Sequence, residues 1–358
     1  MSFQFTRYLY EKKEVMLSLM LGLLNKKESV LFWAYELYYS GFERELIQII
    51  WNVYYDFYAI LNISFEKYLS TKLHNLDEKS VASIIQNLMI RSCTVDVFIL
   101  RQITDHINFN YTYDPNDDTI LVILLNTEDY LQISYFVLNT TNILNRFAVI
   151  LNYFKNRMLI LDDKKEIDKF KKAIKIHELR AKNIILLSRV VYYFTLLKNI
   201  KQCKNLFICI DPSTINMYET IESIEKSNLK ARQILPKART YSIDDDISLF
   251  YLKRDKHDIV KAYRENWEYY ASFSPLWLKR IKQYNGRIYE NEVIFEDDDI
   301  DVFYERYGLD PDEQNQVTQE KSIKQIRKTK TWQEVLSSHK KILTIPDKYL
   351  NLLNKLYY

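Results

Sequence analysis

The chain of 358 residues is long enough for two or three domains or for one extended helical array. Hydrophobic residues make up 47% of it and aromatic residues 15%, which permits a large core and excludes intrinsic disorder over most of its length. The formal net charge of +3 is too small to indicate a nucleic-acid or membrane partner by itself, so any argument about partners depends on local charge.

The first predicted helix covers Val15–Leu24 and ends near Asn25. This segment has the apolar character of a secretory signal, but acidic residues precede it, lysines follow it and no small-residue cleavage site is present. The nearest approach to a membrane-spanning run, Leu46–Ile63, contains Asn52 and Asp56. We therefore expect no membrane span and a soluble, intracellular protein that is not secreted.

The segment Leu31–Tyr58 carries eleven aromatic side chains and a single glycine. We predict a helix over Glu28–Ser40, with Gly41 in the left-handed conformation just after it, and a second helix from Glu43 to about Asn62. The second helix has a narrow polar stripe between two apolar rows, and so wide an apolar surface requires neighbours on two sides. The segment is therefore predicted to be a buried helical hairpin, part of the core scaffold rather than a binding face.

Glycine is rare in this chain, and its only positions are Gly22, Gly41, Gly286 and Gly308. Phosphate-binding loops and nucleophile elbows need glycine for positive φ and for close backbone approach. A P-loop, a dinucleotide-binding fingerprint, a kinase glycine-rich loop and a GxSxG elbow are therefore excluded. Asn285-Gly286 is the one candidate for a tight hairpin turn, and Arg287–Phe295 is the best strand candidate.

Helices are predicted to dominate the rest of the chain, at about 78–90, 94–107, 128–138, 141–158, 164–178, 181–200, 213–230, 255–270 and 319–340. The short apolar runs Ile120–Leu125 and Leu206–Ile210 could be strands, and their length does not decide the matter. No fixed repeat period is present. The predicted fold is mainly α, an irregular array of helical hairpins that could be solenoid-like, with at most a small β-hairpin near 283–296.

Breaks in the helical pattern fall at Asn108–Thr119, at Ala231–Asp246 and after Pro311. They divide the chain into four predicted domains. These are an N-terminal helical-hairpin unit at 1–110, a middle helical unit at 111–235, an aromatic and acidic unit at 236–312 and a basic helical tail at 313–358.

Acid clusters are the strongest indication of chemistry. Asp244–Asp246 and Asp297–Asp301, with Glu292 and Glu296, could hold Mg²⁺, but acids before an apolar helical segment are also typical of helix capping. The cysteines and histidines are scattered without metal-ligand or catalytic spacing; they are Cys93, Cys203, Cys209, His74, His106, His177, His257 and His339. We assign no catalytic, cofactor-binding or metal-binding residue, and the sequence leans against an enzyme without deciding it.

Basic stretches are candidates for contact with nucleic acid or an acidic partner, because clustered lysine and arginine can follow phosphates. The alternative is a solvated helix face. The candidate contact residues are Lys321, Lys324, Arg327, Lys328 and Lys330 in the tail, and Lys237 and Arg239 in the second linker.

Aromatic residues beside cations form a further candidate, an interaction surface made by Trp267, Tyr270, Phe273 and Trp277. The alternative interpretation is a satellite core around Pro275. The acidic block after Glu292 could also pair with the basic run from Lys321, within the chain or between copies of it.

Two segments resemble conserved proteins of nucleocytoplasmic large DNA viruses. One is LFWAYELYYSGFE at 31–43, and the other runs from ENWEYYASFSPLW to FYERYGLDPDEQ at 265–314. Together they cover 63 of the 358 residues. The resemblance brings no catalytic residues with it. It implies a viral context, namely the cytoplasm of the infected host cell, a replication factory or the virion.

The first hypothesis for function is a helical structural or protein-interaction protein in virus replication or assembly. Protein partners are expected, a second copy of the chain among them, and no cofactor. The alternative is a nucleic-acid-associated accessory factor that uses the basic tail and linker. The third hypothesis is a metal-dependent enzyme at the Asp clusters.

Overall fold

The computed structural model describes residues 4–106, 113–158, 162–175, 177–203, 206–216, 241–243, 261, 264–296, 298–307, 317 and 331–357. These residues form two compact units, each assembled from three separate parts of the chain. Unit 1 draws on Met1–Ile49, Lys72–Ile90 and Phe207–Thr329, and unit 2 on Ile50–Thr71, Arg91–Leu206 and Lys330–Tyr358. The four contiguous predicted domains therefore differ from the compact units.

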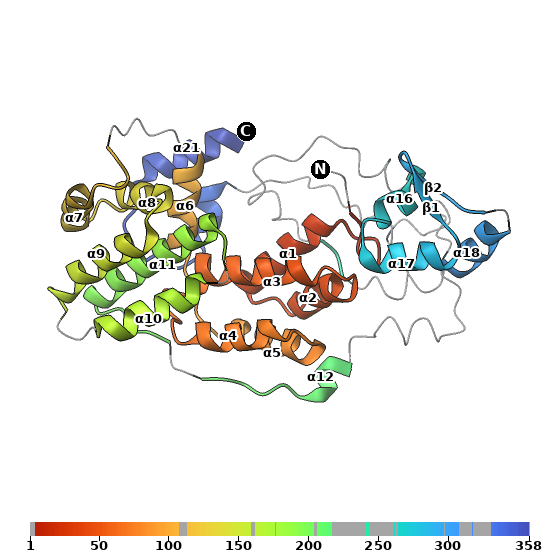
Figure 1. The fold of residues 1–358 in the computed structure, drawn as a ribbon, viewed down its shortest axis with the longest axis horizontal. Coiled ribbons are helices and arrows are strands. Elements are labelled where there is room, and N and C mark those ends of the chain that lie inside the picture. Colours follow the sequence, from red (N-terminus) through yellow and green to blue (C-terminus); the bar gives the residue numbers. More distant parts are fainter. Residues whose placement is uncertain are drawn as a thin grey trace. The chain divides into compact units, whose positions relative to one another are not determined.

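The structure is mainly α, as predicted, with one small β-hairpin in its described part. Figure 1 shows the elements of unit 1 in red and orange (α1, α2, α5), green (α12) and cyan to blue (α16 to α18). They are α1 (Lys12–Asn25), α2 (Val30–Tyr39), α5 (Glu78–Met89), α12 (Pro212–Asn216), α16 (Trp267–Ala271), α17 (Pro275–Gln283), β1 (Arg287–Tyr289), β2 (Glu292–Ile294) and α18 (Asp299–Tyr307). The boundary between the units falls within α3 (Glu43–Val53) and α4 (Phe65–His74).

Unit 2 is built from helices alone among its described residues. They are the π-helix η1 (Tyr54–Tyr58), α6 (Asp96–His106), α7 (Asp118–Thr127), α8 (Tyr130–Asn139), α9 (Ile143–Lys155), α10 (Asp163–Ile174), α11 (Leu179–Leu197), α20 (Trp332–Ser337) and α21 (Asp347–Tyr357). Helix α11 packs against α8 and α9, and α6 packs against α8 and α21 (Figure 1). Within the described residues every helix is too short or too polar to cross a membrane.

Several elements of the structure differ from the predicted ones or decide between predicted alternatives. The run Ile120–Leu125 lies in α7, whereas Leu206–Ile210 has no regular structure. The predicted second helix from Glu43 becomes α3 followed by η1, where the Ala59 N–H donates to the Tyr54 carbonyl in the i→i+5 pattern. Of the predicted helices at 213–230, 255–270 and 319–340, the structure describes only α12, parts of 261–271 and α20, and the rest lies outside the described residues.

Gly41 ends α2 as predicted, in the left-handed region with φ of 84°. The N–H of Phe42 donates to the carbonyl of Leu37 and the N–H of Gly41 to that of Tyr38, which completes a Schellman motif. Pro275 covers this glycine, so that a Cβ atom on Gly41 would lie 2.8 Å from the Pro275 Cβ. The N–H of Leu276 donates to the Ser40 carbonyl. The start of α17 is thus seated on the end of α2.

Replacing Gly41 by alanine is expected to lower the free energy of unfolding by about 2 kcal/mol, because alanine resists positive φ and its Cβ meets Pro275. Urea denaturation measures the loss. The control is Asn199→Gly, at another left-handed helix end with φ of 53°, which should leave stability unchanged or slightly higher. An unfolding midpoint for Gly41→Ala equal to that of the parent chain would contradict this account.

The described residues at 331–357 group with unit 2. The buried carboxylate of Asp96, at the start of α6, accepts hydrogen bonds from the backbone N–H groups of Ile342 and Leu343 at 2.8–3.2 Å. Burial raises the pKa of Asp96, against the opposing effect of these backbone donors. The N–H of Val95 also donates to the carbonyl of Lys340.

Candidate interaction surface

None of the basic residues predicted to contact nucleic acid or an acidic partner lies in the described part of the chain. They are Lys321, Lys324, Arg327, Lys328, Lys330, Lys237 and Arg239. The triplet Asp244–Asp246 also lies outside it. Contact through these residues stays a prediction.

The four predicted aromatic surface residues separate into two buried and two partly exposed side chains. Trp267 and Trp277 are each 2% exposed, with ring centroids 5.4 Å apart. The indole N–H of Trp277 donates to the Thr6 carbonyl at 3.0 Å. Tyr270 and Phe273 keep partial exposure. The two tryptophans are therefore core residues of unit 1 and not part of a solvent-facing surface.

A satellite core surrounds these tryptophans, in line with the alternative interpretation from the sequence. The Arg280 guanidinium lies 4.5 Å from the ring centroid of Trp277 and 4.7 Å from that of Tyr307. Phe303 of α18 is fully buried, and its ring centroid lies 4.6 Å from that of Phe295 at the end of β2. These contacts fix α18 and the β-hairpin to α17.

The β-hairpin is an antiparallel pair in which Arg287 faces Ile294 and Tyr289 faces Glu292. Its turn lies at Glu290, with φ of 51°, and not at Asn285-Gly286 as predicted. Asn285, with φ of 54°, instead ends α17: its N–H donates to the Lys282 carbonyl and that of Gly286 to the Ile281 carbonyl. A helix end and a hairpin turn need the same residue types, which explains the misplaced turn.

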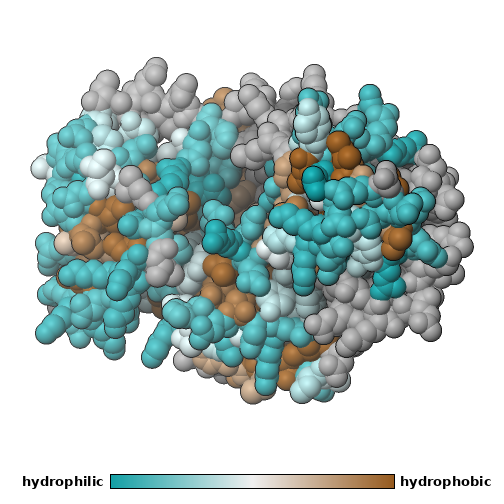
Figure 2. All heavy atoms as spheres, turned by 45° about the vertical axis from the view of Figure 1, so that its right-hand side comes forward, coloured by the Kyte–Doolittle hydropathy of each residue, from teal (hydrophilic) through white to brown (hydrophobic). Residues whose placement is uncertain are grey.

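Exposed hydrophobic side chains gather on the hairpin and α18. Six of the fourteen large hydrophobic side chains that are exposed in the described part of the chain fall between residues 288 and 304. These six define the hairpin surface, and they are Ile288 (46% exposed), Tyr289 (62%), Ile294 (50%), Ile300 (41%), Val302 (50%) and Tyr304 (39%). Figure 2 shows brown hydrophobic patches among teal hydrophilic residues on the side that carries these elements. Such a concentration marks an interaction site more often than an ordinary surface.

The hairpin surface is strongly acidic. The described residues of 287–307 include seven acids and two arginines, a net charge of −5. Arg287 is paired with Glu296 at 2.6 Å. Four exposed acids have no ion-pair partner among the described residues, namely Glu290, Glu292, Asp298 and Asp301. The surface therefore combines apolar anchors with uncompensated negative charge.

The acids at 296–301 lie at the start of α18, as the capping interpretation predicts. The Asp298 carbonyl accepts a hydrogen bond from the Val302 N–H, and the Asp299 carboxylate accepts one from the Asn285 side chain at 2.7 Å. Asp297 itself lies outside the described residues. Among the residues that the structure describes, no three His, Cys, Asp or Glu side chains come together in a way that could hold a metal ion.

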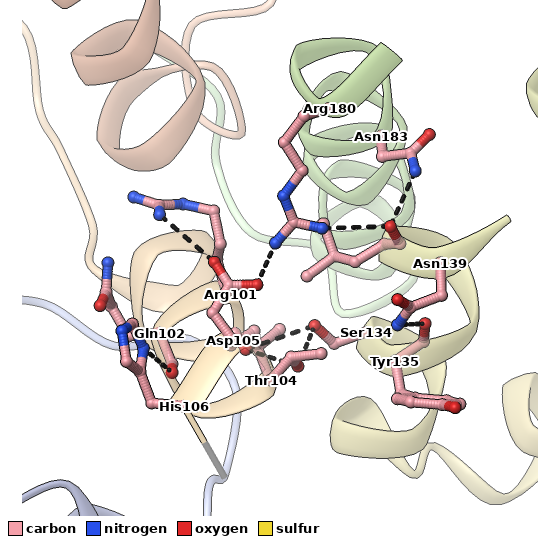
Figure 3. Close-up of polar contacts among 12 residues, drawn as sticks. Arg101, Gln102, Thr104, Asp105, His106, Ser134, Tyr135, Asn139, Arg180 and Asn183 are labelled. Atoms are coloured by element: carbon pink, nitrogen blue, oxygen red, sulfur yellow. Dashed lines mark hydrogen bonds and ion pairs between the residues drawn. The ribbon is translucent and has the colours of Figure 1, made fainter. Parts of the chain in front are cut away.

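Unit 2 holds a separate polar cluster where α6, α8 and α11 meet (Figure 3). Asp105 forms ion pairs with Arg101, at 3.7 Å, and with Arg180. Arg101 also binds both carboxylate oxygens of the buried Asp56. Arg180 and Asn183 donate to the Leu138 carbonyl at the end of α8. The charges balance within this cluster, so we interpret it as a joint between helices.

A second polar cluster in unit 2 is buried. The Arg189 guanidinium donates to Glu66 at 2.6 Å, and the Tyr55 hydroxyl donates to the same carboxylate at 2.8 Å. Burial acts to lower the pKa of Arg189, but Glu66, Tyr55 and Tyr54 together raise it, and the net direction is upward. His177 packs edge-on against Trp51, and burial lowers its pKa. Because 123 residues separate Arg189 from Glu66, no local sequence pattern could reveal the pair.

The sequence also did not identify the hairpin surface. Its six apolar residues are spaced as strand and helix residues that could equally face a core, and only the structure shows them exposed.

The chain matches no protein-family model, no curated protein and no solved structure.

Proposed function

We propose that this chain is a helical structural or protein-interaction protein of virus replication or assembly, and that it binds its partner through the hairpin surface. The concentration of exposed hydrophobic side chains on β1, β2 and α18 supports the binding role. The resemblance of residues 31–43 and 265–314 to proteins of large DNA viruses supports the viral context, in the host cytoplasm or the virion.

The way the hairpin is held supports a preformed binding site. Phe295, Phe303 and the two buried tryptophans anchor its base, while β1 and β2 expose nearly every side chain. A two-stranded hairpin is marginally stable in water without a face to cover it. A partner that covers Tyr289 and Ile294 would bury apolar surface without first ordering the anchored base, which lowers the entropic cost of binding.

The test is co-purification from infected cells or virus particles, with the parent chain compared with Tyr289→Ser/Ile294→Ser. The parent is expected to retain a stoichiometric protein partner. The variant should lose at least about tenfold in retention, because truncating a central apolar anchor commonly costs 2 kcal/mol or more. The matched control is Ile123→Ser/Leu144→Ser, which removes two similarly exposed side chains from unit 2.

Folding must be equal in all three proteins, and thermal unfolding checks it. Equal retention by both double variants would contradict the assignment of binding to the hairpin surface. A parent chain that retains no protein partner and does not self-associate would contradict the proposed function as a whole.

A further inference from the structure

We infer that the partner covering the hairpin surface is a cationic amphipathic segment of another protein, one that carries lysine or arginine beside apolar side chains. This inference rests on the proposed function, because it names the class of partner for the same surface. It follows from how the acids and the apolar anchors are arranged on the two strands and on α18.

On the hairpin, one face presents both anchors together with an acid. Antiparallel pairing places Tyr289 directly opposite Glu292, and Ile294 opposite Arg287, on this same face. Directly opposed residues have Cβ atoms about 5 Å apart. A side chain that packs on Tyr289 therefore lies within reach of the Glu292 carboxylate, and Glu290 follows in the turn.

The positive charge on that face does not offset these acids. Arg287 is engaged by Glu296, whereas Glu290 and Glu292 have no ion pair among the described residues. Like charges placed opposite one another across an interface are unfavourable by several kcal/mol in general, so an acidic partner is disfavoured here. The same charge disfavours nucleic acid and anionic lipid headgroups at this surface.

Helix α18 repeats the combination of apolar and acidic side chains. Ile300 and Tyr304 are four residues apart and share one stripe of the helix, and Asp301 and Glu305 form the adjacent stripe. Lysine and arginine suit such a surface because their aliphatic stems can cover apolar groups while their charged ends reach carboxylates. A segment with apolar residues at helical spacing and flanking cations would match the combination that the strands and α18 each present.

Binding of a synthetic peptide tests the inference. The probe is an amphipathic peptide with leucine at helical spacing and lysine elsewhere, and its counterpart replaces each lysine by glutamate. Fluorescence anisotropy with the full chain should show binding of the lysine peptide alone, weakening as salt is raised. Glu290→Lys/Glu292→Lys should reduce its affinity at least about tenfold at low salt.

The matched control is Glu28→Lys/Asp168→Lys, which makes the same change in net charge at two exposed acids that belong to neither the hairpin nor α18. It should bind the lysine peptide like the parent chain. Equal binding of the two peptides, or equal loss in both charge-reversal variants, would overturn the inference. So would a dimer of the chain alone that is lost in Tyr289→Ser/Ile294→Ser, since a second copy would then cover the surface.

The two proposals fail in different ways. If Tyr289→Ser/Ile294→Ser loses the natural partner while Glu290→Lys/Glu292→Lys retains it at every salt concentration, the interaction function holds and the cationic partner is overturned. If neither variant affects retention of the natural partner, the hairpin surface is not the binding site and both proposals fail.

Discussion

Replacing Glu36 by alanine is expected to destabilise unit 1 by about 3–5 kcal/mol, because it leaves a buried arginine without its counter-ion. The Arg7 Nε donates to the Glu36 carboxylate at 2.8 Å, and the two side chains are 2% and 0% exposed. The other carboxylate oxygen accepts from the Tyr8 N–H at 3.0 Å. One side chain thus satisfies both a buried cation and a backbone donor.

The position of this pair explains why its loss should affect the whole unit. The guanidinium of Arg7 lies over the rings of Tyr8 and Tyr39, at 4.4 and 4.6 Å, and the Arg7 N–H donates to the Ser40 hydroxyl. The N-terminal segment is thereby held on the end of α2, where α17 also docks. Loss of the pair should loosen both contacts.

Urea denaturation measures the effect of Glu36→Ala on the free energy of unfolding, and two double variants serve as controls. Arg7→Leu/Glu36→Leu removes both charges and should recover much of the loss, because well-packed apolar residues can replace a buried pair. Arg287→Ala/Glu296→Ala removes an exposed pair, with side chains 78% and 60% exposed, and should change stability little. If Glu36→Ala lowered the free energy of unfolding no more than Arg287→Ala/Glu296→Ala does, the result would contradict the structure.

Replacing Trp277 by alanine is also expected to have a large effect, lowering the free energy of unfolding by about 3–5 kcal/mol. The indole is 2% exposed, donates a hydrogen bond to Thr6, and packs edge-on against Trp267 and Tyr307. Its removal opens a cavity in the satellite core and leaves the Thr6 carbonyl without this donor. Thermal unfolding and urea denaturation both measure the loss.

This variant distinguishes a core tryptophan from an interface tryptophan. Trp277→Phe keeps an aromatic ring but not the N–H, and it should lower the free energy of unfolding less than Trp277→Ala does. If Trp277→Ala left stability unchanged yet abolished binding of the partner, the residue would act at an interface, which is one of the two interpretations of the sequence, and the packing described for unit 1 would be wrong.

Local sequence patterns predicted the helices well but not their partners. Gly41 marked the end of α2 because few other residues adopt its backbone conformation, and the structure has that conformation there. Helix α4 was missed although Phe65, Leu69 and Leu73 recur every four residues and are buried, because a run of ten residues offers only a short stretch of that pattern. The turn at Glu290 was missed because the residues predicted to form the turn, Asn285-Gly286, end α17 instead.

Long-range packing accounts for what the sequence could not show. The sequence left two interpretations open for the tryptophans of 267–277, a surface or a satellite core, because nothing nearby in the chain indicated that Thr6 would receive an indole hydrogen bond. In the same way, Asp96 at the start of α6 binds backbone 246 residues later, which places residues 331–357 in unit 2. Pairings of this kind depend on the folded topology and leave no periodic signal.

The most direct test of the central claim, that the hairpin surface is where this protein binds its partner, is site-specific photo-crosslinking in cells that produce the protein. A photoreactive phenylalanine analogue would replace Tyr289 in one protein and Ile123, exposed to a similar degree on α7 of unit 2, in another. We predict a single protein adduct from position 289 that is absent from position 123, and whose crosslinked peptide is rich in lysine or arginine. No adduct from position 289, or the same adducts from both positions, would contradict the account.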